Sequence, residues 1–585
     1  MSTSLIKKRI FYVIAILLPL AMLAIVELGL RAIGYGTDNP VFVEAKGRPN
    51  YLTANPDLIK RFFHIGAPTP TISPDTDYFL KTKPQNSLRF VLMGGSTAAG
   101  FPYGRFGSPS AMVKQQLIRL YPDKHIDVIN VAMSSVNSYT LRDIAKDVAL
   151  IEPDAVLIYA GHNEYLGVMG AGSVLSGSGS HLTNLAFLSL KQVRLFQLLQ
   201  SLWQSETPLP TGEGRSLMAQ LAQTQAIPEN SATYAAGVRQ FDDNIQAVIR
   251  TFKERGIPVV ISNIVANEKD QTPFLSLPSK ALPTSCKQNP TDFHRSNASA
   301  LFFTAQCYLA SGDTKAAKMW FREAVNKDQL RFRAHEDINV VIESKIDEQA
   351  VFLADTQERF EAHSPAGIVG NELMLEHLHP NSEGYSLIAQ SFIAGLQEAR
   401  VIGREVPESF FRQDWSKYTL SPVDHVIARQ KIRRLTSDYP FQSSPVIVSP
   451  IKPSSPITTF AMTRENGQPW LSQQPELLDY FAEQGDVAAM ARTAAMLFDA
   501  LPWEHKTAHT AATLLLRAGD LHGAQYYVNQ AIQLASNVEN YWLTRAEIHF
   551  KQGNKSQALA DLKTVLTINP NNKKAPGYIR LISSS

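Results

Sequence analysis

Apolar runs that end in small or polar residues divide the first half of the chain. Residues 90–93, 128–133 and 156–160 are largely apolar, and glycine, serine or asparagine follows each of them. Runs of this length, with helical stretches between them, predict buried strands of a parallel sheet. A fourth run, at 259–263, continues the series. The pattern therefore predicts an α/β fold, in which ligand sites lie at the carboxyl ends of the strands.

The C-terminal part of the chain is repetitive. Gly485-Asp, Gly519-Asp and Gly553-Asn recur at intervals of 34 residues, which is the period of tetratricopeptide repeats. Small or apolar residues occupy the helix-packing positions around these glycines: Leu478, Phe481, Ala512, Leu515, Ala524, Ala531, Trp542, Ala546, Ala558 and Leu562. Each such repeat buries its apolar face only on a neighbour, so an all-α array is expected. One further unit of this pattern, at 293–328, follows the fourth apolar run and is predicted to be an insertion.

An apolar run near the N-terminus predicts a membrane-spanning helix. Residues 10–26 are apolar and follow the basic run Lys7-Lys-Arg9. At about 1.5 Å per residue, such a helix approaches the width of a bilayer's hydrocarbon core. Glu27 then lies near the far interface, where Arg31 can pair with it on the next turn. The basic end is expected to stay cytoplasmic, which places the rest of the chain outside; a cleaved signal peptide is the alternative.

The turn after the first apolar run carries a candidate nucleophile, Ser96. The sequence Gly94-Gly-Ser96-Thr sets one hydroxyl at the end of a strand, among backbone N–H groups and without a bulky neighbour. A serine in this position is either a nucleophile that needs a base or part of a plain turn. Serine is a weak nucleophile at neutral pH, and a histidine oriented by a carboxylate usually activates it.

A second polar motif, Glu376-His-Leu-His379-Pro380, supplies candidate partners far downstream. Glu376 and His379 are three residues apart, so both side chains can point the same way on one turn. Pro380 restricts His379 to extended or turn conformations, as in a histidine presented from a loop. Taken alone, the motif is also typical of a surface turn. His377 could replace His379 as the base, but the His-Pro spacing favours His379.

Four segments in this order resemble the SGNH (GDSL-type) hydrolases, whose blocks run Ser, Gly, Asn and then Asp-x-x-His. The similar segments here are Gly-Gly-Ser96-Thr, Asn130 to Ser138, Gly161-x-Asn163-Glu164 and Glu376-x-x-His379-Pro. The resemblance covers roughly residues 88–165 and 255–395. It implies a three-layer α/β fold around a parallel sheet, with the inserted helical repeat and the C-terminal tetratricopeptide array as additions.

The resemblance also implies a role for five residues. Ser96 would attack an acyl carbonyl while His379 accepts its proton and Glu376 orients the imidazole. The oxyanion would be held by the N–H groups of Ser96 and Ser135 and by the side-chain amide of Asn163. Such preorganised donors are typically worth about 3–4 kcal/mol each in the transition state. The alternative for Asn163 is a turn-forming asparagine.

Two positions depart from the family pattern. The second block usually has glycine where Ser135 stands, and a side chain there takes space beside the acyl group and resists a positive φ. This favours a small acyl group such as acetyl. The last block usually has aspartate where Glu376 stands. Glu376 either reaches His379 across its extra methylene, or His379 works in a dyad, oriented by a backbone carbonyl.

Taken with the resemblance, these patterns give an expected domain order. It comprises an N-terminal transmembrane anchor (1–35), a connecting segment (36–87), the first part of the hydrolase domain (88–290), an inserted helical unit (291–335), the catalytic Glu/His end of the hydrolase domain (336–400), a linker (401–470) and tetratricopeptide repeats (471–585). The linker is expected because residues 443–456 are rich in serine and proline and predict an extended chain.

Composition limits the cofactors and partners. A net charge of +3 over 585 residues argues against a nucleic-acid partner, and no HExxH, paired CxxC or EF-hand pattern indicates a metal or cofactor. Cys286 and Cys307 are the two cysteines, and the sequence does not say whether they meet. Arg331 and Arg333 are expected in surface ion pairs, with an anionic-sugar site as the alternative. The glycine- and serine-rich segment 170–180 predicts a flexible lid or linker.

These features together predict a membrane-anchored, periplasmic serine esterase, most simply of a bacterium. The expected substrate is an ester-linked acyl group, such as O-acetyl, on an extracytoplasmic glycan or a related small ester, and the repeats are expected to dock a protein partner. Acyl transfer to a sugar hydroxyl is an alternative, because exclusion of water is a property of the closed site. A catalytically inactive scaffold for a cell-envelope complex is another, favoured by Ser135 and Glu376.

Overall fold

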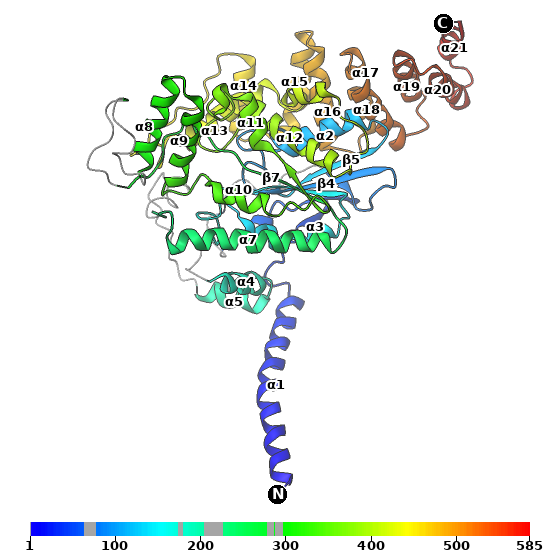
Figure 1. The fold of residues 1–585 in the computed structure, drawn as a ribbon. Helices are drawn as coiled ribbons and strands as arrows, with labels where there is room; N and C mark the ends of the chain where they lie inside the picture. Colours follow the sequence, from blue (N-terminus) through cyan, green and yellow to red (C-terminus); the bar gives the residue numbers. More distant parts are fainter. Residues whose placement is uncertain are drawn as a thin grey trace.

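A five-stranded parallel sheet forms the centre of the computed structural model (Figure 1). Its strands, in spatial order, are β5 (His125–Asn130), β4 (Ser87–Gly94), β6 (Ala155–Tyr159), β7 (Val259–Ser262) and β8 (Val351–Ala354). Every neighbouring pair in this sheet is parallel. The four apolar runs of the sequence overlap β4, β5, β6 and β7, whereas β8 is a strand that these runs did not indicate.

The structure describes residues 2–63, 69, 78–173, 180–203, 226–277, 286 and 297–584. Most of the glycine- and serine-rich segment expected to form a lid, residues 174–179, lies outside this part of the chain.

Helices cover both faces of the sheet. One layer contains α2 (Pro109–Leu120) and α12 (Ser382–Glu398), and the other contains α3 (Ser138–Ala149) and α7 (Ala232–Lys253), as Figure 1 shows. All eight residues of β4 are buried, as expected for a strand packed on both faces. The predicted three-layer α/β fold is confirmed.

Two smaller groups of elements lie outside the central sheet. An antiparallel sheet consists of β1 (Phe42–Ala45), β2 (Arg48–Ala54) and β3 (Phe79–Leu80). A helical hairpin consists of α4 (His181–Leu190) and α5 (Arg194–Trp203). Neither group was predicted as such, since the sequence assigned the first region only as a connecting segment.

The N-terminal helix α1 (Ser2–Ala32) projects away from the rest of the chain (Figure 1). Its stretch Lys8–Ala32 is the one helix among the described residues that is long and apolar enough to cross a membrane. Such a helix is a candidate membrane anchor or signal sequence. The expected pair forms at its end, where Nε of Arg31 lies 2.8 Å from Oε1 of Glu27.

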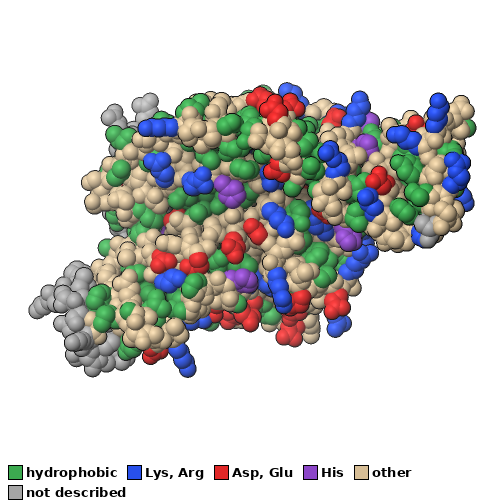
Figure 2. Space-filling model, turned by 90° about the horizontal axis from the view of Figure 1, so that it is seen from above, with side chains coloured by type: hydrophobic (Ala, Val, Ile, Leu, Met, Phe, Trp, Pro, Cys, Tyr) green, Lys and Arg blue, Asp and Glu red, His purple; other side chains and the backbone are tan. Residues whose placement is uncertain are grey.

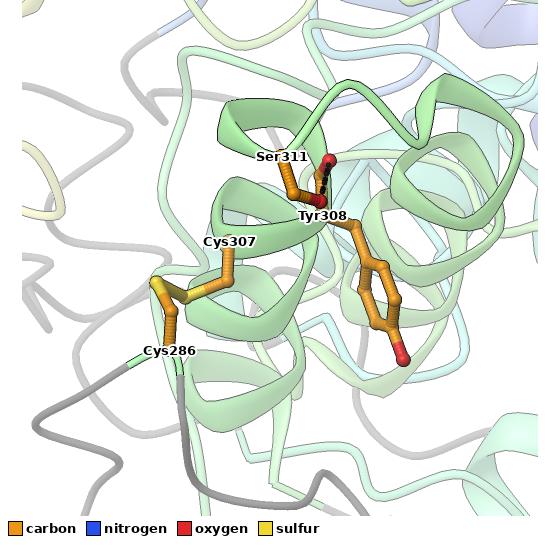
Figure 3. Close-up of a disulfide and its surroundings, with 4 residues drawn as sticks. All are labelled: Cys286, Cys307, Tyr308 and Ser311. Atoms are coloured by element: carbon orange, nitrogen blue, oxygen red, sulfur yellow. Dashed lines mark hydrogen bonds between the residues drawn. A yellow bond between two sulfur atoms is a disulfide. The ribbon is translucent and has the colours of Figure 1, made fainter.

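A pair of helices is inserted between β7 and β8, where the sequence places one repeat unit. The pair consists of α8 (Ala298–Ala310) and α9 (Thr314–Lys327), and α10 (Glu336–Glu343) follows it. Ala305 and Ala317 are fully buried, so the two helices pack closely. A disulfide joins Cys307 of α8 to Cys286, with their Cα atoms 5.3 Å apart (Figure 3). This bond answers the question that the sequence left open.

Helix pairs form the C-terminal array. They are α15 (Trp470–Glu483) with α16 (Val487–Ala500), α17 (His505–Arg517) with α18 (Leu521–Leu534), and α19 (Glu539–Lys551) with α20 (Lys555–Ile568), and α21 (Ala575–Ser584) ends the array. Gly485, Gly519 and Gly553 lie in the turns at φ of 67°, 83° and 82°, a conformation that favours glycine. The predicted helical array is confirmed.

The region expected to be a linker, 401–470, contains regular structure. Helices α13 (Pro422–Leu435) and α14 (Pro456–Glu465) lie in it, and their apolar side chains pack with Leu477 and Phe481 of α15. Residues 436–455, which join the two helices and include most of the serine- and proline-rich stretch, have neither helix nor strand. Composition identified this connection, while the helices on either side of it were missed. The short helix α11 (Thr356–His363) follows β8.

The array docks on α2 through buried charges. Nζ of Lys114 lies 3.2 Å from Oδ1 of Asp499, and Nη2 of Arg119 lies 2.5 Å from Oδ2 of Asp520. The amide of Gln115 donates to Oδ2 of Asp499 at 3.2 Å. Because these side chains are largely buried, the first repeats are fixed to the α/β core and are not suspended from a tether.

Candidate active site

Ser96 lies in the turn that follows β4, two residues beyond the end of the strand. A Cβ on Gly94 would lie 2.1 Å from the carbonyl oxygen of Tyr159, so only glycine allows β4 to end so close to β6. A Cβ on Gly95 would lie 3.0 Å from Nδ2 of Asn163. The two glycines thus allow neighbouring strand ends to approach the serine closely.

The structure brings Ser96 and His379 together. Oγ of Ser96 lies 2.8 Å from Nε2 of His379, although 283 residues separate them in the sequence. This distance permits a hydrogen bond and transfer of the serine proton to the imidazole. The ring of Phe101 packs against the ring of His379 with centroids 4.7 Å apart, which limits the orientations open to the imidazole.

Glu376 contacts His379 on the other side of the imidazole. Oε1 of Glu376 accepts the backbone N–H of His379 at 2.8 Å and also contacts Nδ1 of the ring. Oε2 accepts the backbone N–H of His377 at 2.8 Å and contacts Nδ1 of that ring. One carboxylate therefore orients two imidazoles. The sequence left open whether Glu376 or a backbone carbonyl orients His379. In the structure, the carboxylate of Glu376 contacts Nδ1 of His379.

The segment that carries these residues is held by its own backbone. The N–H of Leu375 donates to the carbonyl of His379 at 2.8 Å, and Asn381 caps helix α12 by accepting from the N–H of Gly384 at 2.9 Å. Pro380 lies between the two. His379 is thus presented from a loop immediately before a buried helix, as Pro380 predicts.

Burial keeps the imidazole of His379 neutral. The residue is 6% exposed, and burial lowers the pKa of His379 to about 3, because the charged form is poorly solvated there. A neutral imidazole can accept the proton of Ser96. Once protonated, it would lie against the carboxylate of Glu376, which stabilises the positive charge.

His377 supports Glu376 and does not contact Ser96. Its imidazole is fully buried and packs against the rings of Phe274, Phe332 and Phe441 at centroid distances of 5.3, 5.9 and 5.3 Å. Burial lowers the pKa of His377 well below its usual value. The nitrogen that faces the serine belongs to His379, as the His-Pro spacing favours.

The two candidate oxyanion residues lie on loops beside Ser96. Ser135 has a φ of 59°, so it adopts the positive φ that the expected glycine would allow, at a cost of about 1–3 kcal/mol. Its carbonyl accepts from the N–H of Val168 at 2.8 Å, which holds this conformation. The side-chain amide of Asn163 lies next to Gly95 and makes no hydrogen bond with any other described residue.

Glu164 is a site-supporting residue whose role the sequence did not indicate. Its Oε1 accepts from Oγ of Ser138 and from Nε2 of Gln240, both at 2.7 Å, and its Oε2 accepts from the N–H of Ser138 at 3.2 Å. The carboxyl lies at the N-terminus of α3, and burial raises the pKa of Glu164 to about 7. Because Glu164 follows Asn163 directly, these bonds fix the loop that carries the amide.

The expected surface ion pairs of Arg331 and Arg333 are wrong. Both side chains are buried, at 1% and 3% exposure. Nη2 of Arg333 lies 3.0 Å from Oδ2 of Asp328, and Nε of Arg331 donates to the carbonyl of Ile227 at 3.0 Å. Neither arginine is available to an anionic sugar, since both hold internal segments together. Across the described part of the chain, no cluster of three or more His, Cys, Asp or Glu side chains could hold a metal ion.

Comparison with known proteins adds the following. The tetratricopeptide repeat family matches residues 539–572. No curated protein matches the sequence. Similar solved structures include a putative GDSL-like lipase from Parabacteroides merdae, with 11% identity over 54% of this chain and 100% of that chain and a TM-score of 0.26. A GDSL-like lipase from Bacteroides thetaiotaomicron has 11% identity over 55% of this chain and 93% of its own, with a TM-score of 0.26.

The helical array has solved counterparts as well. The first tetratricopeptide domain of human RPAP3 is 22% identical over 20% of this chain and 90% of that chain, with a TM-score of 0.18. The family match confirms a tetratricopeptide repeat near the C-terminus. The solved structures also include the GDSL type that the four motifs resemble.

Proposed function

We propose that this chain is a serine ester hydrolase of the SGNH type. The observation that carries the proposal is the contact of Oγ of Ser96 with Nε2 of His379 at 2.8 Å, while Nδ1 of the same ring lies on Glu376. A nucleophile, a base and an orienting carboxylate in line are what acyl transfer through serine requires.

The proposed reaction has two halves. Oγ of Ser96 forms a bond to the acyl carbon as its proton passes to Nε2 of His379, and the carbonyl oxygen becomes an oxyanion. The N–H groups of Ser96 and Ser135 and the amide of Asn163 would hold that oxyanion. The ester C–O bond then breaks, and His379 protonates the leaving alcohol. Water, deprotonated by His379, then attacks the acyl carbon; the bond from that carbon to Oγ of Ser96 breaks, His379 returns its proton to Oγ, and the acid leaves.

The proposed substrate is a small acyl ester, such as an O-acetyl group, on a glycan outside the cytoplasm. The side chain of Ser135 supports the small acyl group, because it adds bulk beside the proposed oxyanion site where the family usually has glycine. The disulfide Cys286–Cys307 supports a location outside the cytoplasm, because disulfides persist in oxidising compartments. The basic residues that precede the apolar part of α1 support the same orientation.

A fluorophosphonate probe tests the enzymatic proposal. The full-length chain in detergent is expected to be labelled and to hydrolyse p-nitrophenyl acetate, and Ser96→Ala is expected to lose the label and roughly 10⁴-fold or more of the hydrolysis. Ser311→Ala, at the end of α8 (Figure 3), is the matched control and should behave like the parent. Absence of both labelling and hydrolysis in the parent would contradict the esterase and leave a scaffold as the function.

A further inference from the structure

The hairpin α4–α5 is attached to the end of the candidate membrane helix. Oε1 and Oε2 of Glu27 accept the backbone N–H groups of Arg194 at 3.0 Å and Leu195 at 2.8 Å. Nη2 of Arg31 donates to the carbonyl of Gln192 at 3.0 Å. The last turns of α1 therefore cap the first turn of α5, and the hairpin lies between α1 and the α/β core (Figure 1).

Helix α5 buries two of its polar side chains and exposes two of its leucines. Arg194 and Gln197 are buried; Nε2 of Gln197 donates to the carbonyl of Thr37 at 2.8 Å. On the other side, Leu199 is 46% exposed and Leu202 is 74% exposed. This polarity is the reverse of a helix on a water-facing surface.

Helix α4 also exposes leucines. Leu182 is 76% exposed and Leu190 is 44% exposed. The only Lys, Arg, Asp or Glu residues between positions 180 and 203 are Lys191 and Arg194, and both are buried. The hairpin thus exposes leucines and no side chain of these four charged types over the residues whose burial is described. In contrast, the face of the molecule seen in Figure 2 carries basic and acidic side chains interspersed.

We propose that α4–α5 rests in the headgroup and acyl boundary of the same bilayer that α1 spans. This inference depends on the proposed anchoring by α1. A lipid surface is favoured over a protein because the apolar patch adjoins the end of the spanning helix, which places it at the level of the membrane surface. An interfacial helix buries its apolar face about 5–10 Å into that boundary, and exposed leucines without charges fit such an environment.

The hairpin also contacts elements near the candidate active site. The amide of Asn184 donates to the carbonyl of Met169 at 3.4 Å, and the hydroxyl of Tyr139 bonds to Nδ1 of His181 at 2.9 Å. Met169 follows Asn163 on the same loop, and Tyr139 belongs to α3. A hairpin seated on lipid would therefore fix the orientation of this edge of the sheet relative to the bilayer.

Depth-dependent fluorescence quenching of single labels tests whether the hairpin α4–α5 lies at the membrane surface. Full-length variants Leu182→Cys, Leu202→Cys, Leu18→Cys and Leu581→Cys carry a bimane label and are reconstituted into phosphatidylcholine vesicles. The native cysteines are paired with each other and do not react. Labels at 182 and 202 are expected to be quenched several-fold more by a lipid spin-labelled near its headgroup than the label at 581, which lies on α21 at the far end of the chain (Figure 1).

The label at position 18 separates the two proposals. It is expected to be quenched by a lipid spin-labelled deep in the acyl chain, as a spanning α1 requires. Suppose that the label at 18 is quenched, while the labels at 182 and 202 are quenched no more than the label at 581. The membrane contact of the hairpin is then refuted, and the membrane-spanning role of α1 stands. If the label at 18 is not quenched, or if position 18 is absent from the mature protein, α1 is not a membrane anchor. The proposed membrane contact of the hairpin is then refuted as well. Hydrolysis by Ser96 is measured separately and bears on neither.

Discussion

Two regions of the molecule bury carboxylates for different purposes. At the candidate active site, Glu376 is 5% exposed and contacts two histidines. At the interface between α2 and the helical array, Asp499 is 3% exposed and pairs with Lys114. Burial of an ion is costly in both places and is tolerated only where several donors compensate.

The origin of the donors separates the two regions. All the donors that reach Glu376 come from the next three residues of the chain, and one ring nitrogen is left to face Ser96. Donors to Asp499 include Gln115 of α2, 384 residues away in the sequence, and Tyr527 of α18. The first arrangement prepares a reaction, and the second joins two parts of the fold. Substitutions should therefore affect activity in one region and stability in the other.

The largest effect is expected for Glu376→Gln. The amide of glutamine presents an N–H group toward one of the donors that now meet a carboxylate oxygen, and it cannot stabilise an imidazolium. We expect kcat/KM for p-nitrophenyl acetate to fall about 10⁴-fold, while the free energy of unfolding changes by less than about 2 kcal/mol. Steady-state kinetics and urea unfolding of the full-length chain measure the two quantities.

The double variant Ser96→Ala/Glu376→Gln is the control for this effect. Residues that act as a unit are not additive, so the double variant should be no slower than Ser96→Ala alone. If the two losses multiply, Glu376 does not act through Ser96.

The residues of the candidate site were easier to predict from the sequence than the residues that hold them in place. Ser96 and His379 follow from local signals, a glycine turn after an apolar run and a histidine before proline. The role of Glu164 depends on Ser138 and Gln240, which come from different helices, and no local pattern reveals such a contact. In the same way, the strand β8 is short and follows a helical insertion, so its apolar run did not stand out.

The helical regions show a similar division. The glycine interval identified the array, because each repeat forms its contacts with its neighbours in the sequence. Its docking on α2 was not predicted, since Lys114 and Asp499 are charged residues that the sequence would place on a surface. The hairpin α4–α5 was missed for the opposite reason: its leucines indicate burial in a core, whereas in the structure they are exposed.

The second largest effect is expected for Asp499→Ala, which removes an ion-pair partner of the buried Lys114. Lys114 would keep its charge with one fewer acceptor, and we expect the free energy of unfolding to fall by about 3–5 kcal/mol. Hydrolysis per folded molecule should stay unchanged. Urea unfolding followed by circular dichroism, with the esterase assay on the folded fraction, checks both parts.

Glu408→Ala is the matched control for the interface. Glu408 forms a pair with Arg412 at 3.1 Å in which both side chains are about four-fifths exposed. An exposed pair of this kind contributes roughly 0–1 kcal/mol. If Asp499→Ala were no more destabilising than Glu408→Ala, the array would not depend on this buried pair.

The smallest effect concerns the dependence of activity and stability on pH. The pKa of a buried histidine is shifted in opposite directions in the two regions. Burial lowers the pKa of His379, so the base loses its activity only as pH falls well below the ordinary histidine value of about 6.5. The acid limb of kcat/KM should therefore lie below that value. At the interface, burial opposes the charge of His125, but the carboxylate of Asp127 outweighs it and the net pKa of His125 is raised.

The two histidines should also contribute oppositely to stability. Between the folded and unfolded pKa values of His379 the unfolded chain binds more protons, so this contribution is lost as pH falls. The contribution of His125 is present below about pH 6.5 and is lost as pH rises through its raised pKa. Thermal unfolding of His125→Gln should lose this second dependence and keep the acid limb of activity. An acid limb at or above pH 6.5 in the parent would contradict the burial of a neutral His379.

Three residues of the candidate site lie within one short stretch of the chain, and this has a mechanical consequence. Glu376, His377 and His379 are linked by bonds within a stretch of four residues, so a displacement of that stretch would carry all three together. Their mutual distances would be conserved, and the single length that would vary is the gap to the hydroxyl on the opposite loop. Any motion that switches the reaction on or off needs to alter only that one separation.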